Sequence, residues 1–141
     1  MGRAEAAVEL RAVLESLVRG LQSRRGADGL TPPQTSVLSL LETRGPMTAS
    51  NLAAVEQIRP QSIATILSQL FRRRLVTRSS DPSDARSVLV SVTARGRQAV
   101  LDARAEQVRH LERAIAAALT ADELEQFAAV ISVLERLSRH V

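Results

Sequence analysis

Apolar residues recur every three or four positions along most of the chain, which is the spacing that places them on one face of an α-helix. Short polar stretches interrupt this pattern, and helices are expected to end there. The pattern predicts six helices, over residues 4–23, 31–44, 49–56, 60–72, 93–118 and 120–140.

The starts of these helices contain residues that can satisfy the free N–H groups of a first turn. Thr31 lies three residues before Gln34, so the two side chains can form a capping box. Thr93 can cap the long helix, whose first turn contains Gly96. Glycine at that position is expected to weaken the helix by about 1 kcal/mol relative to alanine.

Residues 75–92 depart from the helical pattern and have the features of a β-hairpin. The segments LVTRSS (75–80) and SVLVSV (87–92) are strand-like. Apolar residues occupy both faces of the second segment, so we expect it to be buried on both. The Asp-Pro-Ser-Asp sequence between the two segments favours a turn.

Two short helices joined by a tight turn at residues 57–59, and followed by a hairpin, are the elements of a winged helix-turn-helix. The second of these helices is apolar on one side and polar on the other. We therefore expect a mainly α fold with a small β-wing, in one domain of residues 1–141. The winged lobe is expected at residues 31–97.

The first and last helices carry apolar rows that extend beyond a single buried face. We expect residues 4–23 and 98–140 to form the dimerisation region of a homodimer, and the alternative is a monomeric helical core. The residues expected at the dimer interface are Leu10, Leu14, Leu17, Leu124, Phe127, Ile131 and Leu134.

The positive charge of the chain is concentrated in one segment. The net charge is +4, yet residues 59–97 contain eight arginines against two aspartates, a local net charge of +6. Residues 1–58 are balanced, and residues 98–141 carry two more acids than arginines. Such clustering indicates a polyanionic partner.

Composition argues against several other classes of protein. The absence of cysteine rules out disulfides and cysteine-ligated metals, and the 1% aromatic content leaves no tyrosine or tryptophan on which unpaired bases could stack. His110 and His140 are far apart in sequence and have no carboxylate pattern around them, so no metal site is expected.

The chain also lacks the motifs of an enzyme or a membrane protein. No nucleophile–base pair or phosphate-binding loop is evident, so neither catalysis nor a cofactor is expected. No apolar run is long enough for a signal sequence or a membrane span. We expect a cytoplasmic protein that does not bind membranes.

The segment from Leu52 to Arg97, LAAVEQIRPQSIATILSQLFRRRLVTRSSDPSDARSVLVSVTARGR, resembles the MarR (multiple antibiotic resistance regulator) family of bacterial transcription factors. Within it, RPQSIATILSQL looks like the recognition helix of the family. The stretch DPSDARSVLVSVTARGR looks like the wing, its second strand and the entry to the long helix.

The resemblance implies a transcriptional regulator that binds double-stranded DNA as a homodimer, with a repressor at a pseudo-palindromic operator as the expected form. Many family members bind a small, often aromatic, acid between the dimer helices and the winged lobe, which releases the DNA. A small-molecule effector of unknown identity is therefore a further expectation. The alternative function is a winged-helix module that binds proteins and has no sequence-specific DNA readout.

The expected DNA contacts lie on the polar side of the recognition helix and around it. The first turns of such a helix enter the major groove most deeply, so Gln61 is expected to read a base, with Ser62 and Thr65 beside it. Arginines around the helix are expected to contact phosphates, and the alternative is a solvated surface arginine. The full set is Arg59, Gln61, Ser62, Thr65, Gln69 and Arg72 at the recognition helix, with Arg73 and Arg78 as further phosphate contacts.

The turn of the wing is expected to carry an arginine towards the DNA. Arg86 matches the wing arginine of the family, and a narrow A·T-rich minor groove attracts such a side chain. Asp84 matches the acid that orients this arginine; ordinary turn chemistry is the alternative for Asp84 and for Asp81. Ala85 departs from the family, in which this position is often basic, so minor-groove binding is expected to be weaker or to rest on Arg86 alone.

Overall fold

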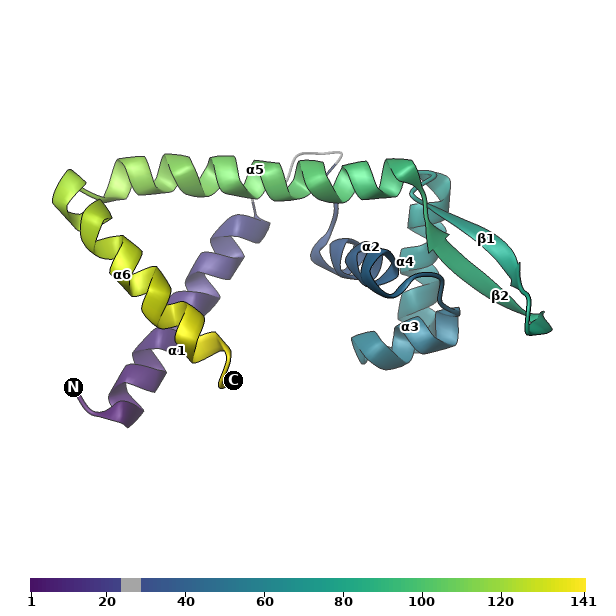
Figure 1. The fold of residues 1–141 in the computed structure, drawn as a ribbon, viewed down its shortest axis with the longest axis horizontal. Helices are drawn as coiled ribbons and strands as arrows, with labels where there is room; N and C mark the ends of the chain where they lie inside the picture. The colour runs from purple at the N-terminus through teal and green to yellow at the C-terminus, as the bar shows by residue number, and fades with distance from the viewer. Residues whose placement is uncertain (24–28) are drawn as a thin grey trace. The chain divides into compact units, whose positions relative to one another are not determined.

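The computed structural model describes residues 1–23 and 29–141 (Figure 1). The described residues form a mainly helical fold with a two-stranded antiparallel wing, which confirms the predicted fold class. None of the described helices is long and apolar enough to cross a membrane. In chain order the elements are α1 (Arg3–Gln22), α2 (Pro32–Arg44), α3 (Ala49–Glu56), α4 (Pro60–Arg72), β1 (Val76–Asp81), β2 (Asp84–Val92), α5 (Ala94–Ala118) and α6 (Ala121–Ser138).

The chain groups into two compact units, residues 1–106 and 107–141, and α5 contributes residues to both. The first unit contains the helix-turn-helix and the wing, and the second contains the end of α5 and all of α6. The expectation of one domain over the whole chain stays a prediction.

The predicted capping box at the start of α2 is confirmed. The hydroxyl of Thr31 accepts a hydrogen bond from the backbone N–H of Gln34 at 3.2 Å, and the side-chain oxygen of Gln34 accepts one from the N–H of Thr31 at 3.0 Å. These bonds satisfy two backbone groups that a helix end otherwise leaves without partners.

The core of the winged lobe lies between α2, α3, α4 and the wing. Its most completely buried side chains are Val37, Leu38, Leu41, Leu52, Ile63, Leu70 and Val100. Burial of each such side chain contributes about 1.5–3 kcal/mol, which makes this apolar cluster the main source of stability of the lobe.

Strand β2 connects the wing to the rest of the lobe. Figure 1 shows β1 and β2 as a hairpin, and β2 also forms a bridge to the segment before α3, where Met47 and Val90 exchange backbone hydrogen bonds of 3.1 and 2.8 Å. Val90 and Val92 are buried, whereas Val88 is exposed and Leu89 half-buried. The second strand is therefore buried mainly on one face, and the expectation of burial on both faces was wrong.

The second strand starts earlier than the sequence pattern predicts. It begins at Asp84, which pairs with Asp81, so only Pro82 and Ser83 remain in the turn. Arg86 therefore lies within β2, two residues after Asp84, and the predicted start of the strand at residue 87 was wrong. The pairing is irregular here, because Ser80 pairs with Val88 whereas Asp81 pairs with Asp84. Residues 85–87 therefore form an irregularity in β2, next to the turn in which Asp81 accepts hydrogen bonds from Ser83.

The terminal helices bury none of their residues within a single chain. This holds for all of α1, Arg3–Gln22, and all of α6, Ala121–Ser138. Leu17 in α1 is 53% exposed, and Ile131 in α6 is 44% exposed. Their apolar rows are therefore not completely buried in a single chain.

A close junction joins the end of α4, the wing and the start of α5. Arg74 adopts a left-handed backbone conformation, with φ of 60°, and turns the chain from α4 into β1. The N–H of Thr93 donates to the carbonyl of Leu75 at 3.0 Å, and the hydroxyl of Thr93 donates to the carbonyl of Arg74 at 2.8 Å. The same hydroxyl accepts from the N–H of Gly96 at 3.0 Å, so Thr93 caps α5 and joins it to the two residues that precede β1.

Gly96 is required by this junction. A Cβ at position 96 would lie 2.2 Å from the carbonyl oxygen of Leu75 and 2.8 Å from a methyl group of Val92. Since the first of these atoms belongs to the backbone, it cannot move aside at low cost. The expected loss of helix propensity is therefore accompanied by a packing role that the sequence did not indicate, because the absence of a side chain lets α5 approach Leu75 and Val92.

We predict that Gly96→Ala lowers the free energy of unfolding by about 1–3 kcal/mol, since overpacking outweighs the helix propensity that alanine gains. Urea denaturation followed by circular dichroism measures this change. Gly20→Ala is the matched control, because a Cβ there meets no atom within 4 Å. Equal or greater stability of Gly96→Ala would contradict the role of the junction.

Candidate nucleic-acid interface

The second helix of the helix-turn-helix, α4, separates an apolar face from a polar one. Ile63, Leu67 and Leu70 are buried in the lobe and hold the helix in place. Gln61 and Thr65 are exposed on the opposite side. Pro60 occupies the first position of the helix, where a backbone N–H would have no partner within the helix, and its ring fixes φ near the helical value.

Among the expected base-reading residues, Gln61, Ser62 and Thr65 lie together in the first turns of α4 and are all exposed. The hydroxyl of Thr65 donates to the carbonyl of Gln61 at 3.1 Å. This bond occupies the hydroxyl with the helix backbone, and the methyl group of Thr65 remains for apolar contact. Arg59, the residue before the helix, and Arg72, at its end, are exposed as well.

Gln69 differs from the other residues of the predicted set. It is half-buried, and its side-chain oxygen accepts a hydrogen bond of 2.9 Å from the side-chain nitrogen of Gln34. Gln34 is 6% exposed and belongs to the capping box of α2. Sequence reasoning assigned Gln34 to the cap alone, because a contact across 35 positions leaves no periodic signal.

The arginines expected to contact phosphates have different surroundings. Arg73 is half-buried, whereas Arg78 is exposed on β1. The guanidinium carbon of Arg78 lies 4.0 Å from the centre of the Phe71 ring, a cation–π contact between the wing and α4. This contact places the charge of Arg78 beside α4.

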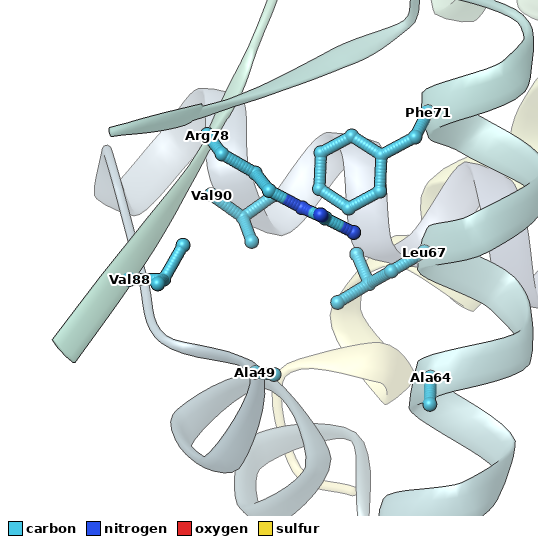
Figure 2. Close-up of a pocket in the computed structure, with 7 residues that line it drawn as sticks. All are labelled: Ala49, Ala64, Leu67, Phe71, Arg78, Val88 and Val90. Carbon is cyan, nitrogen blue, oxygen red and sulfur yellow. The ribbon is translucent and has the colours of Figure 1, made fainter. Parts of the chain in front are cut away.

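A hollow of about 300 Å³ lies next to this contact, between α4, the start of α3 and the wing. Figure 2 shows the Arg78 side chain reaching from its strand towards the Phe71 ring, above the apolar side chains that form the walls. The hollow is lined by Ala49, Ala64, Leu67, Phe71, Arg78, Val88 and Val90. Its walls are apolar, and Arg78 is the charged residue among those that line it.

The tip of the wing is organised by two aspartates. Asp81 accepts hydrogen bonds from the hydroxyl of Ser83 at 2.7 Å and from its backbone N–H at 2.9 Å. Both bonds hold the pKa of Asp81 below its ordinary value, and the bond from the hydroxyl has the larger effect. The stabilisation of the turn is therefore present at neutral pH, and it is lost as the pH falls through the lowered pKa.

Arg86 extends from the wing into solvent. Its backbone N–H donates to a carboxylate oxygen of Asp84 at 3.0 Å, and its side-chain Nε lies 4.0 Å from the same oxygen. The Arg86 side chain is 97% exposed. Asp84 thus holds the backbone of Arg86 by a hydrogen bond of the kind found in turns, and the orienting role expected for Asp84 stays a prediction.

An exposed polar helix face, flanked by arginines and followed by a wing that carries an exposed arginine, defines a winged helix-turn-helix protein. Comparison with known proteins agrees with this class. The sequence model of the MarR family matches residues 30–88. An HTH-type transcriptional repressor of Mycobacterium tuberculosis is 33% identical over 107 residues, which cover 75% of this chain and 76% of that protein.

Two solved structures share the fold. A putative transcriptional regulator from Pseudomonas aeruginosa superposes with a TM-score of 0.78 and 32% identity, over 96% of this chain and 94% of that one. A point mutant of Staphylococcus aureus MepR, bound to an oligodeoxyribonucleotide, superposes with a TM-score of 0.68 and 20% identity, over 96% of this chain and 98% of its own. The chain belongs to the MarR family of winged helix-turn-helix transcriptional regulators and not to a family of enzymes.

Proposed function

We propose that this regulator binds double-stranded DNA sequence-specifically as a homodimer and acts as a repressor at a pseudo-palindromic operator. The observation that carries the proposal is the exposed polar face of α4, which lies in the segment of net charge +6. The repressor from M. tuberculosis supports the direction of regulation, and MepR bound to an oligodeoxyribonucleotide supports the partner.

In the proposed complex α4 enters the major groove. The amide of Gln61 matches the hydrogen-bonding edge of adenine, and the methyl group of Thr65 matches that of thymine. Ser62 contacts a base or a phosphate. Phosphate contacts come from Arg59, Arg72, Arg73 and Arg78, of which Arg78 is already held beside α4 by Phe71.

The wing supplies a second contact, in the minor groove. An arginine gains most in a narrow, A·T-rich groove, where the negative potential is strongest. The Arg86 side chain is 97% exposed and its contact with Asp84 is long, at 4.0 Å, so it can extend into such a groove. Ala85 adds no charge beside it, and the minor-groove contact therefore rests on Arg86.

The homodimer is supported by the exposed apolar rows of the terminal helices. Leu14 and Leu17 of α1 and Leu124 and Ile131 of α6 are each 44–53% exposed in one chain. Leu10, Phe127 and Leu134 are half-buried. A second copy that covers these rows would remove their apolar surface from water.

A winged-helix module that binds proteins is the alternative function. It is disfavoured because the positive charge is confined to residues 59–97, around the helix-turn-helix and the wing, while the flanking segments are balanced or acidic. The small-molecule effector implied by the family resemblance stays a prediction.

DNA selected from a random pool tests the proposed function. We expect two half-sites in the bound sequences, and an affinity that falls by roughly 10³–10⁵-fold between 50 and 200 mM salt if six to ten phosphates are contacted. No binding at low salt would exclude the proposal.

Gln61→Ala should relax base preference at one position of each half-site, at a cost of about 1–3 kcal/mol. Gln98 is an exposed glutamine of α5, so Gln98→Ala is the control and should leave the preference unchanged.

For the wing, we predict that Arg86→Ala weakens binding mainly to operators with A·T-rich flanks, since only a narrow minor groove attracts this side chain strongly. Fluorescence anisotropy on operators that differ only in their flanks measures the effect. Arg136→Ala removes the same charge from α6 and should affect all flanks alike. An equal loss on every flank for Arg86→Ala would rule out the minor-groove role.

For the dimer, we predict that Ile131→Asp halves the molecular mass measured by light scattering at micromolar concentration, because a carboxylate in a covered apolar row is strongly unfavourable. Ser132→Asp introduces the same charge on another side of α6 and should leave the mass unchanged. A monomeric mass for the unmodified protein would refute the homodimer.

A further inference from the structure

A directed chain of hydrogen bonds runs from the start of α2 to the recognition helix. The backbone N–H of Thr31 donates to the side-chain oxygen of Gln34 at 3.0 Å. The side-chain nitrogen of Gln34 then donates to the side-chain oxygen of Gln69 at 2.9 Å. Gln34 is 6% exposed, so water does not compete freely for this amide.

The backbone N–H of Thr31 fixes the direction of this series of hydrogen bonds. A backbone N–H can only donate, so the oxygen of the Gln34 amide must face Thr31 and its NH₂ group must face Gln69. An NH₂ group is also only a donor, so Gln69 must meet it with its oxygen. The orientation of the Gln69 amide is therefore set by the backbone of Thr31, through Gln34.

The NH₂ group of Gln69 is consequently the part of its amide that does not face Gln34. We propose that Gln34 is a positioning residue that makes Gln69 present this donor to a phosphate of the bound DNA. This role rests on the proposed DNA binding. It gives Gln34, a buried residue of α2, a part in that binding without contact to the DNA.

A phosphate suits this donor better than a base does. Gln69 lies in the third turn of α4, beyond Gln61 and Ser62 in the first turn, and base contacts come mainly from the start of a recognition helix. Phosphate oxygens only accept hydrogen bonds, so the NH₂ donor of Gln69 is the type of group that they require. The two-point contact of a glutamine with adenine needs the oxygen as well, and in Gln69 that atom is engaged with Gln34.

Gln34→Glu tests the role of Gln34 with little change in shape. A glutamate can still accept from the N–H of Thr31, but its second oxygen also accepts, so the Gln69 amide must rotate and turn its own oxygen outwards. We expect the affinity for the selected operator to fall roughly ten- to a hundredfold per half-site, since a charge-assisted hydrogen bond is replaced by repulsion. The loss should be the same for all base sequences at the contacted step.

A double-mutant cycle with Gln69→Ala separates this effect from the added charge. In the Gln69→Ala protein, Gln34→Glu should retain only a small loss, because the general effect of the charge is common to both backgrounds. Urea denaturation of each variant shows whether it is folded. If Gln34→Glu weakens binding equally with and without Gln69, the positioning role is refuted.

Methylphosphonate-substituted DNA provides a test that does not depend on a variant of Gln34. Replacing the contacted phosphate with this neutral group should remove most of the difference in affinity between the unmodified protein and Gln69→Ala. A difference that persists at every substituted position, or that follows the base sequence, would overturn the phosphate contact. Failure of the unmodified protein to bind any selected DNA would instead overturn the proposed function, and this inference with it.

Discussion

The carbonyl oxygen of Leu75 occupies the space in which a side chain at position 96 would begin, and the winged lobe depends on this contact. The same carbonyl accepts the N–H of Thr93, and the Thr93 hydroxyl joins the carbonyl of Arg74 to the N–H of Gly96. The end of α4, both wing strands and the start of α5 therefore meet at one point. The direction of the recognition helix relative to the first turns of α5 is set by short backbone contacts, which deform less readily than side-chain packing.

The recognition helix is held from three directions. Ile63, Leu67 and Leu70 fix its buried face in the core. On one flank the Gln34 amide holds Gln69, and on the other Arg78 of the wing lies over Phe71. These contacts leave the face with Gln61 and Thr65 exposed, so the residues proposed to read DNA carry little of the stability of the lobe. Substitutions there are expected to change recognition more than folding.

Charge and apolar surface are divided between different parts of the chain. The arginine excess is confined to residues 59–97, where α4 and the wing lie, while exposed apolar rows run along α1 and α6. Electrostatic attraction acts over the distance of a Debye length, about 8 Å at physiological salt, whereas apolar association requires contact. The proposed DNA contact and the proposed dimer contact thus use different forces on separate surfaces, which allows both to form at once.

The sequence by itself determined the features that depend on near neighbours: the helices, the capping box of Thr31 and Gln34, the turn at Asp81 and the polar face of α4. Each arises from periodicity or from hydrogen bonds within a few residues, and periodicity is visible in one dimension. Tertiary structure alone decided why position 96 is glycine, that Gln34 orients Gln69, that Arg78 lies over Phe71, and that Met47 pairs with Val90. These contacts join residues that are distant in sequence or on different elements. No local pattern predicts them, because they exist only once the core has brought the elements together.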